Sequence, residues 1–464
     1  MPLSFCRPFV LVVLAILPGV RIVHAQQHAR QDPVVLDYAD SLKSAKVDSE
    51  EVRHFLGHVK VHQGNVQISC DQAVHNLKTN LVEMNGSVRI LQDTLLITAP
   101  HAVYDAKTKI ARADGNVRLS DRVALLTATN GTYNTDTHVA EFHEHVKIVN
   151  DTATITANDL NYDRNTERSI ATGNVTIVDS SAVITCGVLR NDRVTQQSWC
   201  SGAVRVRGRQ DPSQLFGDSM YQDSRKGYTN VPRNPFLAHV DSTRPDSASP
   251  WKYDTMFIVS HTMEAFRSNQ ETYMAHDSVR LLRGDMQARC SEGKFFRSED
   301  RIILSRSPVL WYHDTQLTGD SIAITLFQNK LQRLTCENSA FAIVRRDSLH
   351  PMRFDQLTGS RLAMRFSDDS LRSIRVEKNA QSVYFGYEEG KARGANRASG
   401  DTIEIKLAHG KPDKVYTMGG GEGQFWPEKL VKKNELDFRL NGFENREAER
   451  PKRNDFVMPG SSGK

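Results

Sequence analysis

Gly57-His-Val-Lys-Val61 is the first of six copies of one short phrase in this chain of 464 residues. The copies begin at residues 57, 86, 115, 144, 173 and 202, so every step is 29 residues long. A fixed period of this length is typical of arrays in which each unit buries its apolar face against its neighbours. The later copies are Gly86-Ser-Val-Arg-Ile90, Gly115-Asn-Val-Arg-Leu119, Glu144-His-Val-Lys-Ile148, Gly173-Asn-Val-Thr-Ile177 and Gly202-Ala-Val-Arg-Val206.

Each repeat contains two β-strands with one apolar face. Around the first residue of the phrase, apolar and polar side chains alternate, as they do in a half-buried strand. The Gly has the same parity as the inward residues, and we expect it to bend the strand where a side chain would clash. A second strand follows, with a branched aliphatic eleven positions after the Gly and Ala or Cys two positions later. The branched aliphatics are Ile68, Ile97, Leu126, Ile155 and Ile184.

An aromatic residue followed by Asn or Asp ends most of these second strands. Tyr104, Tyr133 and Tyr162 occupy equivalent positions of three repeats, and each precedes Asp or Asn. Asn and Asp favour turns because their side chains bond to the backbone two residues further on. We therefore expect a strand end and a turn at each of these points.

The repeat predicts an all-β protein, an elongated open β-jellyroll or solenoid built from two consecutive arrays. Its inside is either a closed, dry core or an apolar groove, and the pattern alone favours neither. In the second array the repeat is looser, with Ser278-Val-Arg-Leu281, Ser307-Pro-Val-Leu310 and Ser339-Ala-Phe-Ala-Ile-Val344 as its recognisable copies.

Composition divides the chain into five parts. Arg7, an apolar run and small residues before Ala25 predict a cleaved signal peptide over residues 1–25. Four prolines between residues 231 and 250 predict a linker or loop. The segment 427–464 is rich in Lys, Glu and Arg, which predicts a flexible tail. Between these parts lie the regular repeat domain, 26–230, and the degenerate repeat region, 251–426.

Charge and cysteine usage exclude some functions. The formal net charge of +5 is too small to indicate nucleic-acid binding. No Cys-x-x-Cys pair is present, so neither a zinc site nor a redox motif is predicted. Of the cysteines after the leader, Cys186 and Cys200 are close enough in sequence to pair across neighbouring strands.

The chain contains no sequence motif that we can assign to catalysis. It lacks Gly-x-Ser-x-Gly, His-Glu-x-x-His and a phosphate-binding loop, and Gly419-Gly-Gly-Glu-Gly423 is expected to be a turn. We therefore predict a protein that is not an enzyme, with no catalytic residues, metal ligands or cofactor. A carbohydrate-active β-helix, whose acidic residues converge only in the folded coil, stays open as an alternative.

A column of basic residues faces away from the apolar side chains of the phrase. If this column lies on a solvated surface, acidic residues elsewhere balance its charge. The functional hypothesis is contact with anionic head groups or with an acidic partner. The column contains Lys60, Arg89, Arg118, Lys147 and Arg205.

The leader, the repeated phrase and strands such as Val103-Tyr-Asp105 and Leu160-Asn-Tyr-Asp163 resemble the OstA-like family. This family includes the LptA-type periplasmic proteins and the organic-solvent-tolerance N-terminal domain of lipopolysaccharide transport. The resemblance covers residues 33–230 closely and 251–426 loosely. It implies an apolar β-groove that shields lipid acyl chains. The residues expected to line it are Val59, Val61, Ile68, Val88, Ile90, Ile97, Val117, Leu119, Leu126, Phe142, Val146, Ile148, Ile155, Val175, Ile177 and Ile184.

The resemblance also implies a location and partners. We expect a periplasmic protein, with a possible association with the outer membrane, that binds lipopolysaccharide or a related lipid. Other transport-bridge proteins would join it by strand addition at the sheet ends, and a homo-oligomer is a further option. The alternative to a lipid carrier is a structural or adhesive β-solenoid with a dry interior.

Overall fold

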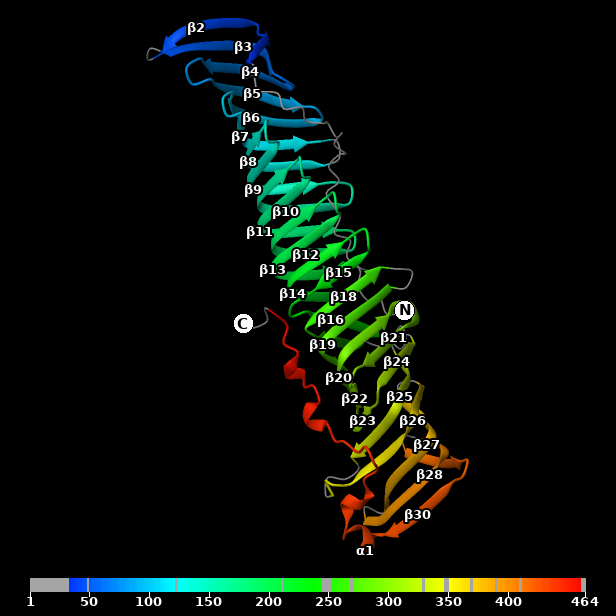
Figure 1. Cartoon of the computed structure of the whole chain (residues 1–464). Coiled ribbons are helices and arrows are strands. Elements are labelled where there is room, and N and C mark those ends of the chain that lie inside the picture. Colours follow the sequence, from blue (N-terminus) through cyan, green and yellow to red (C-terminus); the bar gives the residue numbers. More distant parts are fainter. Residues whose placement is uncertain are drawn as a thin grey trace. The chain divides into compact units, whose positions relative to one another are not determined.

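The computed structural model describes residues 33–47, 50–121, 124–209, 212–243, 252–267, 271–327, 330–345, 350–367, 370–388, 391–408 and 411–459. The predicted signal peptide lies outside these residues. The chain is an all-β protein of antiparallel strands, as the repeat predicted, and Figure 1 shows the strands of the N-terminal part following one another in chain order from β3 to β13. Two compact units divide the described residues: an N-terminal unit of residues 33–209 and 218–227, and a C-terminal unit of residues 212–217 and 228–459.

The N-terminal unit is built from strands that follow one another along the chain. Consecutive strands from β3 to β13 pair antiparallel, each with the next. Its strands are β1 (Val35–Tyr38), β2 (Ser41–Val47), β3 (Glu50–Gln63), β4 (Val66–Asn76), β5 (Leu81–Gln92), β6 (Leu95–Asp105), β7 (Ile110–Ser120), β8 (Leu125–Asn134), β9 (Val139–Val149), β10 (Ala153–Asp163), β11 (Arg168–Asp179), β12 (Ala182–Asp192) and β13 (Gln197–Gly208); β14 (Ser213–Asp223) is shared between the units.

The C-terminal unit holds the remaining strands and a few short helices. Its strands are β15 (Tyr228–Val231), β16 (Phe236–Thr243), β17 (Lys252–Val259), β18 (Thr262–Arg267), β19 (Glu271–Arg283), β20 (Met286–Phe296), β21 (Arg301–Ser305), β22 (Val309–Tyr312), β23 (Thr315–Thr318), β24 (Ser321–Phe327), β25 (Lys330–Arg345), β26 (Phe354–Ser367), β27 (Ser370–Glu388), β28 (Lys391–Ala408), β29 (Lys411–Met418) and β30 (Glu422–Pro427). Helix α1 (Glu428–Val431) and the 3-10 turns η1 (Arg297–Glu299), η2 (Glu435–Phe438), η3 (Glu447–Glu449) and η4 (Arg453–Asp455) complete it.

The repeated Gly marks a corner at which the strand turns. Gly86 has φ +75° and Ser87 has φ +47°, and the pairing of β5 shifts register at this point. A Cβ on Gly86 would lie 2.3 Å from Asp71 Oδ2, which confirms the expected clash. Two residues on one strand therefore oppose one on its partner, which is a β-bulge. The N-terminal unit repeats this corner at Gly57–His58, Gly86–Ser87, Gly115–Asn116, Glu144–His145, Gly173–Asn174 and Gly202–Ala203.

The same corner recurs in the C-terminal unit, where the sequence repeat is loose. Consecutive positive φ angles occur at Asp277–Ser278, Arg306–Ser307, Asn338–Ser339 and Lys378–Asn379. The three Ser-led phrases predicted as later copies thus begin at structural corners. Both units therefore use one bend, although Gly begins it at five of the six corners of the first unit and Asp, Arg, Asn or Lys begins it in the second.

Each corner divides a strand into two arms. We call the arm that ends at four-residue turns, such as 77–80 and 106–109, the long-turn arm, and the arm that ends at turns such as 64–65 and 93–94 the short-turn arm. The predicted Asx turns are confirmed: Asn76 Oδ1 accepts a bond from the backbone N–H of Lys78 at 3.0 Å, and Asp105 Oδ1 accepts one from Lys107 at 2.9 Å.

Part of the predicted linker, residues 231–250, is a strand, β16. Pro232 and Pro235 precede β16 without interrupting it, and β16 pairs with β17 along its whole length. Proline is tolerated where it precedes a strand, because no ladder hydrogen bond is then lost. Residues 244–250 of the predicted linker lie outside the described part of the chain.

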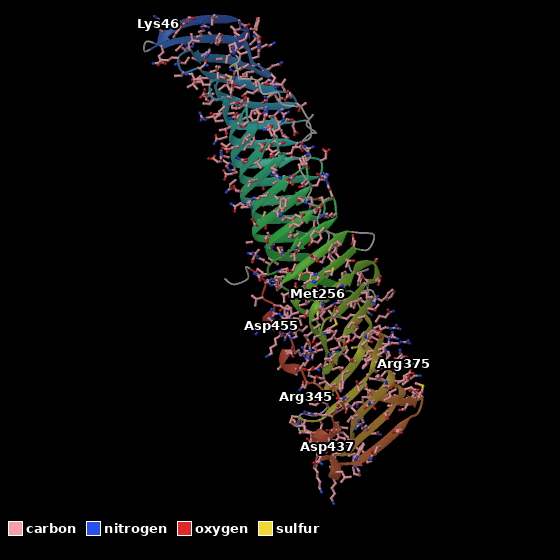
Figure 2. The ribbon with its side chains drawn as sticks, viewed as in Figure 1. Lys46, Met256, Arg345, Arg375, Asp437 and Asp455 are labelled. Carbon is pink, nitrogen blue, oxygen red and sulfur yellow. The ribbon has the colours of Figure 1, made fainter. Side chains whose placement is uncertain are left out.

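The prediction of a flexible tail is wrong for residues 427–459. This segment buries Val431, Phe438, Leu440 and Phe456 against the sheet of the C-terminal unit. Figure 2 places its Asp437 and Asp455 on the segment, while Met256 of β17 belongs to the interior. These buried apolar residues lie among many Lys, Glu and Arg residues and have no regular spacing, so the sequence pattern did not indicate them.

The described cysteines are Cys70, Cys186, Cys200, Cys290 and Cys336, and all five are buried free thiols. Cys186 and Cys200 are nevertheless neighbours: a hydrogen bond that the Cys200 thiol donates to Cys186, together with burial, raises the pKa of Cys200. Among the described residues, no helix has the length and apolar character needed to cross a bilayer.

Candidate functional site

The inner face of the short-turn arm carries an unbroken ladder of branched aliphatic side chains. The two predicted apolar columns interleave, so that Ile90 pairs with Ile97 and Leu119 pairs with Leu126. All of these side chains are buried. In strand order from β3 to β13 the ladder is Val61, Ile68, Ile90, Ile97, Leu119, Leu126, Ile148, Ile155, Ile177, Ile184 and Val206.

A second inner row lies nearer the corner. It alternates Val with Ala or Cys, so that Val88 pairs with Ala99 and Val117 with Ala128. The predicted groove-lining residues of this row are Val59, Val88, Val117, Val146 and Val175, and all are buried. The structure thus brings all sixteen predicted lining residues to one interior, with Phe142 on the facing arm.

The long-turn arm presents large and small side chains in alternation to this ladder. Phe142 lies over Gly131, where an added Cβ would be 2.7 Å from the ring. Tyr133 is flanked by Ala111 and Ala140 on the neighbouring strands. Large side chains thus fill the spaces that the small ones leave.

Very little free space is left between the arms. The cavity that Leu119, Leu126, Ile148, Phe142 and Leu160 line holds only about 20 Å³. Asp121 and Tyr162 border the same cavity. The interior is thus a packed apolar core in this conformation, and a guest of any size requires the two arms to separate.

The tips of the two arms meet along a line of polar contacts that we call the seam. Tyr104 Oη donates a hydrogen bond to Gln63 Oε1 at 2.5 Å, and Tyr133 Oη donates one to Gln92 Oε1 at 2.7 Å. Each bond joins a long-turn arm to a short-turn arm across an interval of 41 residues. Gln92 also donates from Nε2 to the backbone oxygen of Thr135 at 3.2 Å.

An ion pair and a third tyrosine extend the seam. Arg164 Nη1 lies 3.2 Å from Asp93 Oδ2, with both residues in turns at the arm tips. Burial, together with the nearby Glu167 and Asp121 carboxylates, raises the pKa of Tyr162 to about 12. The seam therefore closes the apolar interior with reversible polar contacts and no covalent bond.

The outer faces of the two arms differ in charge. On the short-turn arm the predicted basic residues form one column, but they do not stack directly. Arg89 and Arg118 both pair with Thr98 of the strand between them, and Thr127 likewise separates Arg118 from Lys147. Since neighbouring strands lie about 4.8 Å apart, consecutive charges are roughly 10 Å apart. The repulsion between them is correspondingly small.

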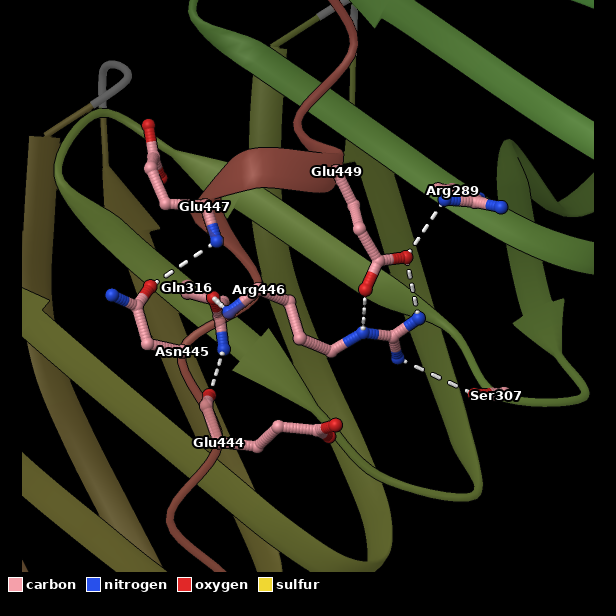
Figure 3. Close-up of polar contacts among 8 residues, drawn as sticks. All are labelled: Arg289, Ser307, Gln316, Glu444, Asn445, Arg446, Glu447 and Glu449. Carbon is pink, nitrogen blue, oxygen red and sulfur yellow. Dashed lines mark hydrogen bonds and ion pairs between the residues drawn. The ribbon is translucent and has the colours of Figure 1, made fainter.

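In the C-terminal unit, residues 428–459 form a segment that we call the strap. Figure 3 shows the Gln316 side chain forming two hydrogen bonds with the backbone of the strap. Its Nε2 donates to the backbone oxygen of Glu444 at 2.8 Å, and its Oε1 accepts from the backbone N–H of Arg446 at 2.8 Å. Gln356 repeats this arrangement with Phe438 oxygen, at 2.9 Å, and the N–H of Leu440, at 2.8 Å. Two side-chain amides thus hold an extended peptide.

Charged groups fix the strap at both ends of this contact. Arg353 is fully buried and pairs with Glu428 at 2.9 Å and with Glu435 at 2.8 Å. Further along, Glu449 bridges Arg446, at 2.7 Å, and Arg289, at 2.8 Å (Figure 3). The strap is therefore an integral part of the C-terminal unit.

Sequence reasoning missed the seam and the strap contacts. Tyr104 and Tyr133 were interpreted only as strand ends, and their partners Gln63 and Gln92 were not singled out. Their constant interval of 41 residues is a signal in principle, but it has meaning only once the corner is known. Gln316, Gln356 and Arg353 leave no repeated signal at all.

Among the described residues, no group of three or more His, Cys, Asp or Glu side chains is placed to hold a metal ion. A comparison with curated proteins finds no match to this chain. Residues 31–187 match the family model described as OstA-like protein. This family belongs to lipopolysaccharide transport and organic solvent tolerance and is periplasmic. The matched segment covers β1 to β11 and about half of β12, and it includes five of the six corners of the N-terminal unit. The repeat domain of this chain is therefore an OstA-like domain.

Proposed function

We propose that the N-terminal unit carries the acyl chains of lipopolysaccharide or a related lipid between its two arms, on the way to the outer membrane. The single observation that carries this proposal is the aliphatic ladder, which no polar side chain interrupts from β3 to β13. A closed domain of this size needs a core, but it does not need the same residue class on every strand.

The physical requirement for such a ladder is clear. Each methylene returned to water costs roughly 0.8 kcal/mol, so a chain of about a dozen carbons costs on the order of 10 kcal/mol. A lipid moving along the ladder exchanges one apolar contact for the next. No covalent chemistry is needed for this step, and the protein acts as a carrier rather than an enzyme.

Entry requires the seam to open, because the interior is filled by its own side chains. The seam bonds are hydrogen bonds and one exposed ion pair, each worth about 1 kcal/mol net. Acyl burial can offset several such contacts. The basic column would then face the solvent or a partner while the chains stay inside.

The sheet ends offer docking places for other proteins of a transport bridge. At one end, β1 and β2 each pair only with β3 among the described strands, and Leu42 is 54% exposed. At the other end, β29 and β30 pair with β28, and Val415 and Phe425 are 59% and 58% exposed. Unpaired edges with exposed apolar side chains favour strand addition, by a partner or by a second copy of the chain.

Site-specific photo-crosslinking in cells tests the proposal. Crosslinkers at Ile97, Leu126 and Ile155 should capture lipopolysaccharide, whereas one at Arg112 on the outer face of the long-turn arm should not. The proposal fails if the interior positions never capture lipid while the protein is folded and exported.

The structural β-solenoid stays as a second candidate, because the cavity between the arms beside Leu119 and Leu126 holds only about 20 Å³. A dry core predicts that no condition opens the seam. Hydrogen exchange of the amides of Thr135 and His138 in the presence of lipopolysaccharide discriminates between the two. Faster exchange favours the carrier, and unchanged exchange favours the solenoid.

A further inference from the structure

The outer face of the short-turn arm has a composition that the interior does not explain. From β3 to β13, the outward side chains between the corners and the short turns include no Asp or Glu. Six are basic and eight are Ser or Thr, and apolar residues make up most of the rest. The basic residues are Lys60, Arg89, Arg118, Lys147, Arg205 and Arg207.

The outer face of the long-turn arm serves as the internal comparison. It belongs to the same strands but is rich in carboxylates, including Glu83, Asp114, Glu141 and Asp159. Several of these carboxylates pair with His101 or His143 on the same face. The outer faces of the two arms therefore carry opposite charge. A surface that only contacts solvent does not require basic and acidic residues to be separated in this way.

Four of the six basic residues of the short-turn face form no ion pair in the described part of the chain. No ion pair within the described ranges involves Lys60, Arg89, Arg118 or Lys147, although the chain is rich in acidic residues. The nearest acidic positions are at the margins, in β1, in the corners and in the short turns. Charged side chains held this way attract anions from solution.

A hollow lies beside this column at the corner. It encloses about 380 Å³ and is lined by Arg89, Thr98, Pro100, Gly115 and Asn116, among others. A guanidinium, a hydroxyl and a side-chain amide thus border a space large enough for a sugar ring with its substituents. Hydroxyl, amide and guanidinium donors together suit the oxygens of an anionic sugar.

We propose that the outer face of the short-turn arm binds a linear anionic glycan along its basic column, with the hollow beside Arg89 as one subsite. The donors repeat at roughly 10 Å along the column, which matches a ligand with regularly spaced negative groups. This inference does not depend on what the interior carries.

The twist of the sheet favours a flexible chain over a flat bilayer. In Figure 1 the strands of the N-terminal unit change direction steadily from β4 to β13. A column that crosses these strands winds with the sheet, so a plane touches only part of it at once. A glycan chain can follow the winding and contact every basic residue.

Fluorescence polarisation with labelled polygalacturonate oligomers tests the proposal on the full-length mature protein. The double variant Arg89→Gln/Arg118→Gln should weaken binding at least tenfold, since each lost charge-assisted hydrogen bond is worth about a factor of ten. The matched control, Arg112→Gln/Arg190→Gln, removes the same charge from the long-turn face of β7 and β12 and should change binding less than twofold. Thr98→Val, which alters only the hollow, should weaken binding by about threefold.

Three outcomes overturn the proposal. One is equal weakening by both double variants, which would show that net charge alone attracts the glycan. Another is no binding of polygalacturonate above that of neutral dextran. The third is binding of wild-type protein to phosphatidylglycerol vesicles, lost in Arg89→Gln/Arg118→Gln, without any binding of the glycan. That result would assign the face to a membrane surface.

Discussion

The two units share one bend but close their sheets differently. In the N-terminal unit the arm tips meet directly, and Tyr–Gln hydrogen bonds such as Tyr133–Gln92 close the gap. In the C-terminal unit a separate segment, the strap, covers the sheet and is held by Gln316, Gln356 and Arg353. A direct seam can open by breaking a few hydrogen bonds and one exposed ion pair, whereas release of the strap would expose the buried Arg353 and its aromatic contacts. On the function proposed above, lipid would therefore enter the first unit.

The strap should provide the largest mutational effect. Arg353→Ala leaves Glu428 and Glu435 without their buried partner and should lower the free energy of unfolding of the C-terminal unit by about 3 kcal/mol. Arg361→Ala, which removes a half-exposed arginine paired with Glu337 and Glu377, should cost less than about 1 kcal/mol. Hydrogen exchange of residues 428–440 measures both. Equal protection in the two variants would mean that the strap is not held by Arg353.

Removal of one hydrogen bond in the seam should have a smaller effect on stability than the loss of Arg353. Tyr133→Phe removes the donor to Gln92 and should lower the stability of the N-terminal unit by about 1–2 kcal/mol. Urea denaturation, monitored by far-UV circular dichroism, measures this loss of stability. Amide exchange at Thr135 should also become faster. Tyr253→Phe, at a position 71% exposed, is the control and should have no effect. An unaffected seam in Tyr133→Phe would argue that packing alone joins the arms.

Both units share the corner, where the backbone has a positive φ angle. Substitution to Gly should be tolerated at this position, whereas substitution of Gly by a residue with a side chain should not. Glu144 has φ +61° where the other repeats of its unit have Gly, so Glu144→Gly should stabilise the unit by about 1 kcal/mol. Gly173→Ala should destabilise it, because the added Cβ would lie 2.6 Å from Asn158 Nδ2. Thermal unfolding of the two variants should move in opposite directions. Shifts of the same sign would remove backbone conformation as the reason for the repeated Gly.

The acidic face of the long-turn arm should give the smallest effect. The hydrogen bond from His101 to Asp114, at 2.8 Å, raises the pKa of His101. Stabilisation by this histidine is therefore fully present below its unfolded pKa, near 6.5, and is lost as the pH rises through the folded pKa. His101→Asn should cost a few tenths of a kcal/mol at pH 6 and almost nothing at pH 8.5. A loss that is larger at pH 8.5 would contradict the assigned partner.

The sequence was most informative where structure repeats. Strand alternation with a period of two predicted which side chains of Val88–Ile90 and Ile97 point inward, because opposite residues in a ladder share a face. The Gly phrase predicted a bend, and the Ser-led phrases located the same bend in the second unit. Burial can be predicted from the sequence of one repeat because each repeat packs against neighbours of the same kind.

Contacts between distant positions could not be predicted. The seam depends on how sharply each strand turns at its corner, and that angle is not written in any one repeat. The strap was missed because Phe438, Phe443 and Phe456 are scattered among charged residues, and its backbone is held by glutamines far away in the sequence. The basic column was predicted, but the Thr residues that separate its charges emerged only from the strand register.

The most direct test of the central claim is a tether across the seam. Asp93→Cys/Arg164→Cys replaces an ion pair whose atoms lie 3.2 Å apart, and a short bis-maleimide can join the two exposed thiols while the native cysteines stay buried. A control tether, Arg112→Cys/Thr132→Cys, joins neighbouring strands on the long-turn face without crossing the seam. Binding of purified lipopolysaccharide should be lost in the seam-tethered protein and kept in the control. Unchanged binding with the seam closed would show that the lipid does not enter between the arms.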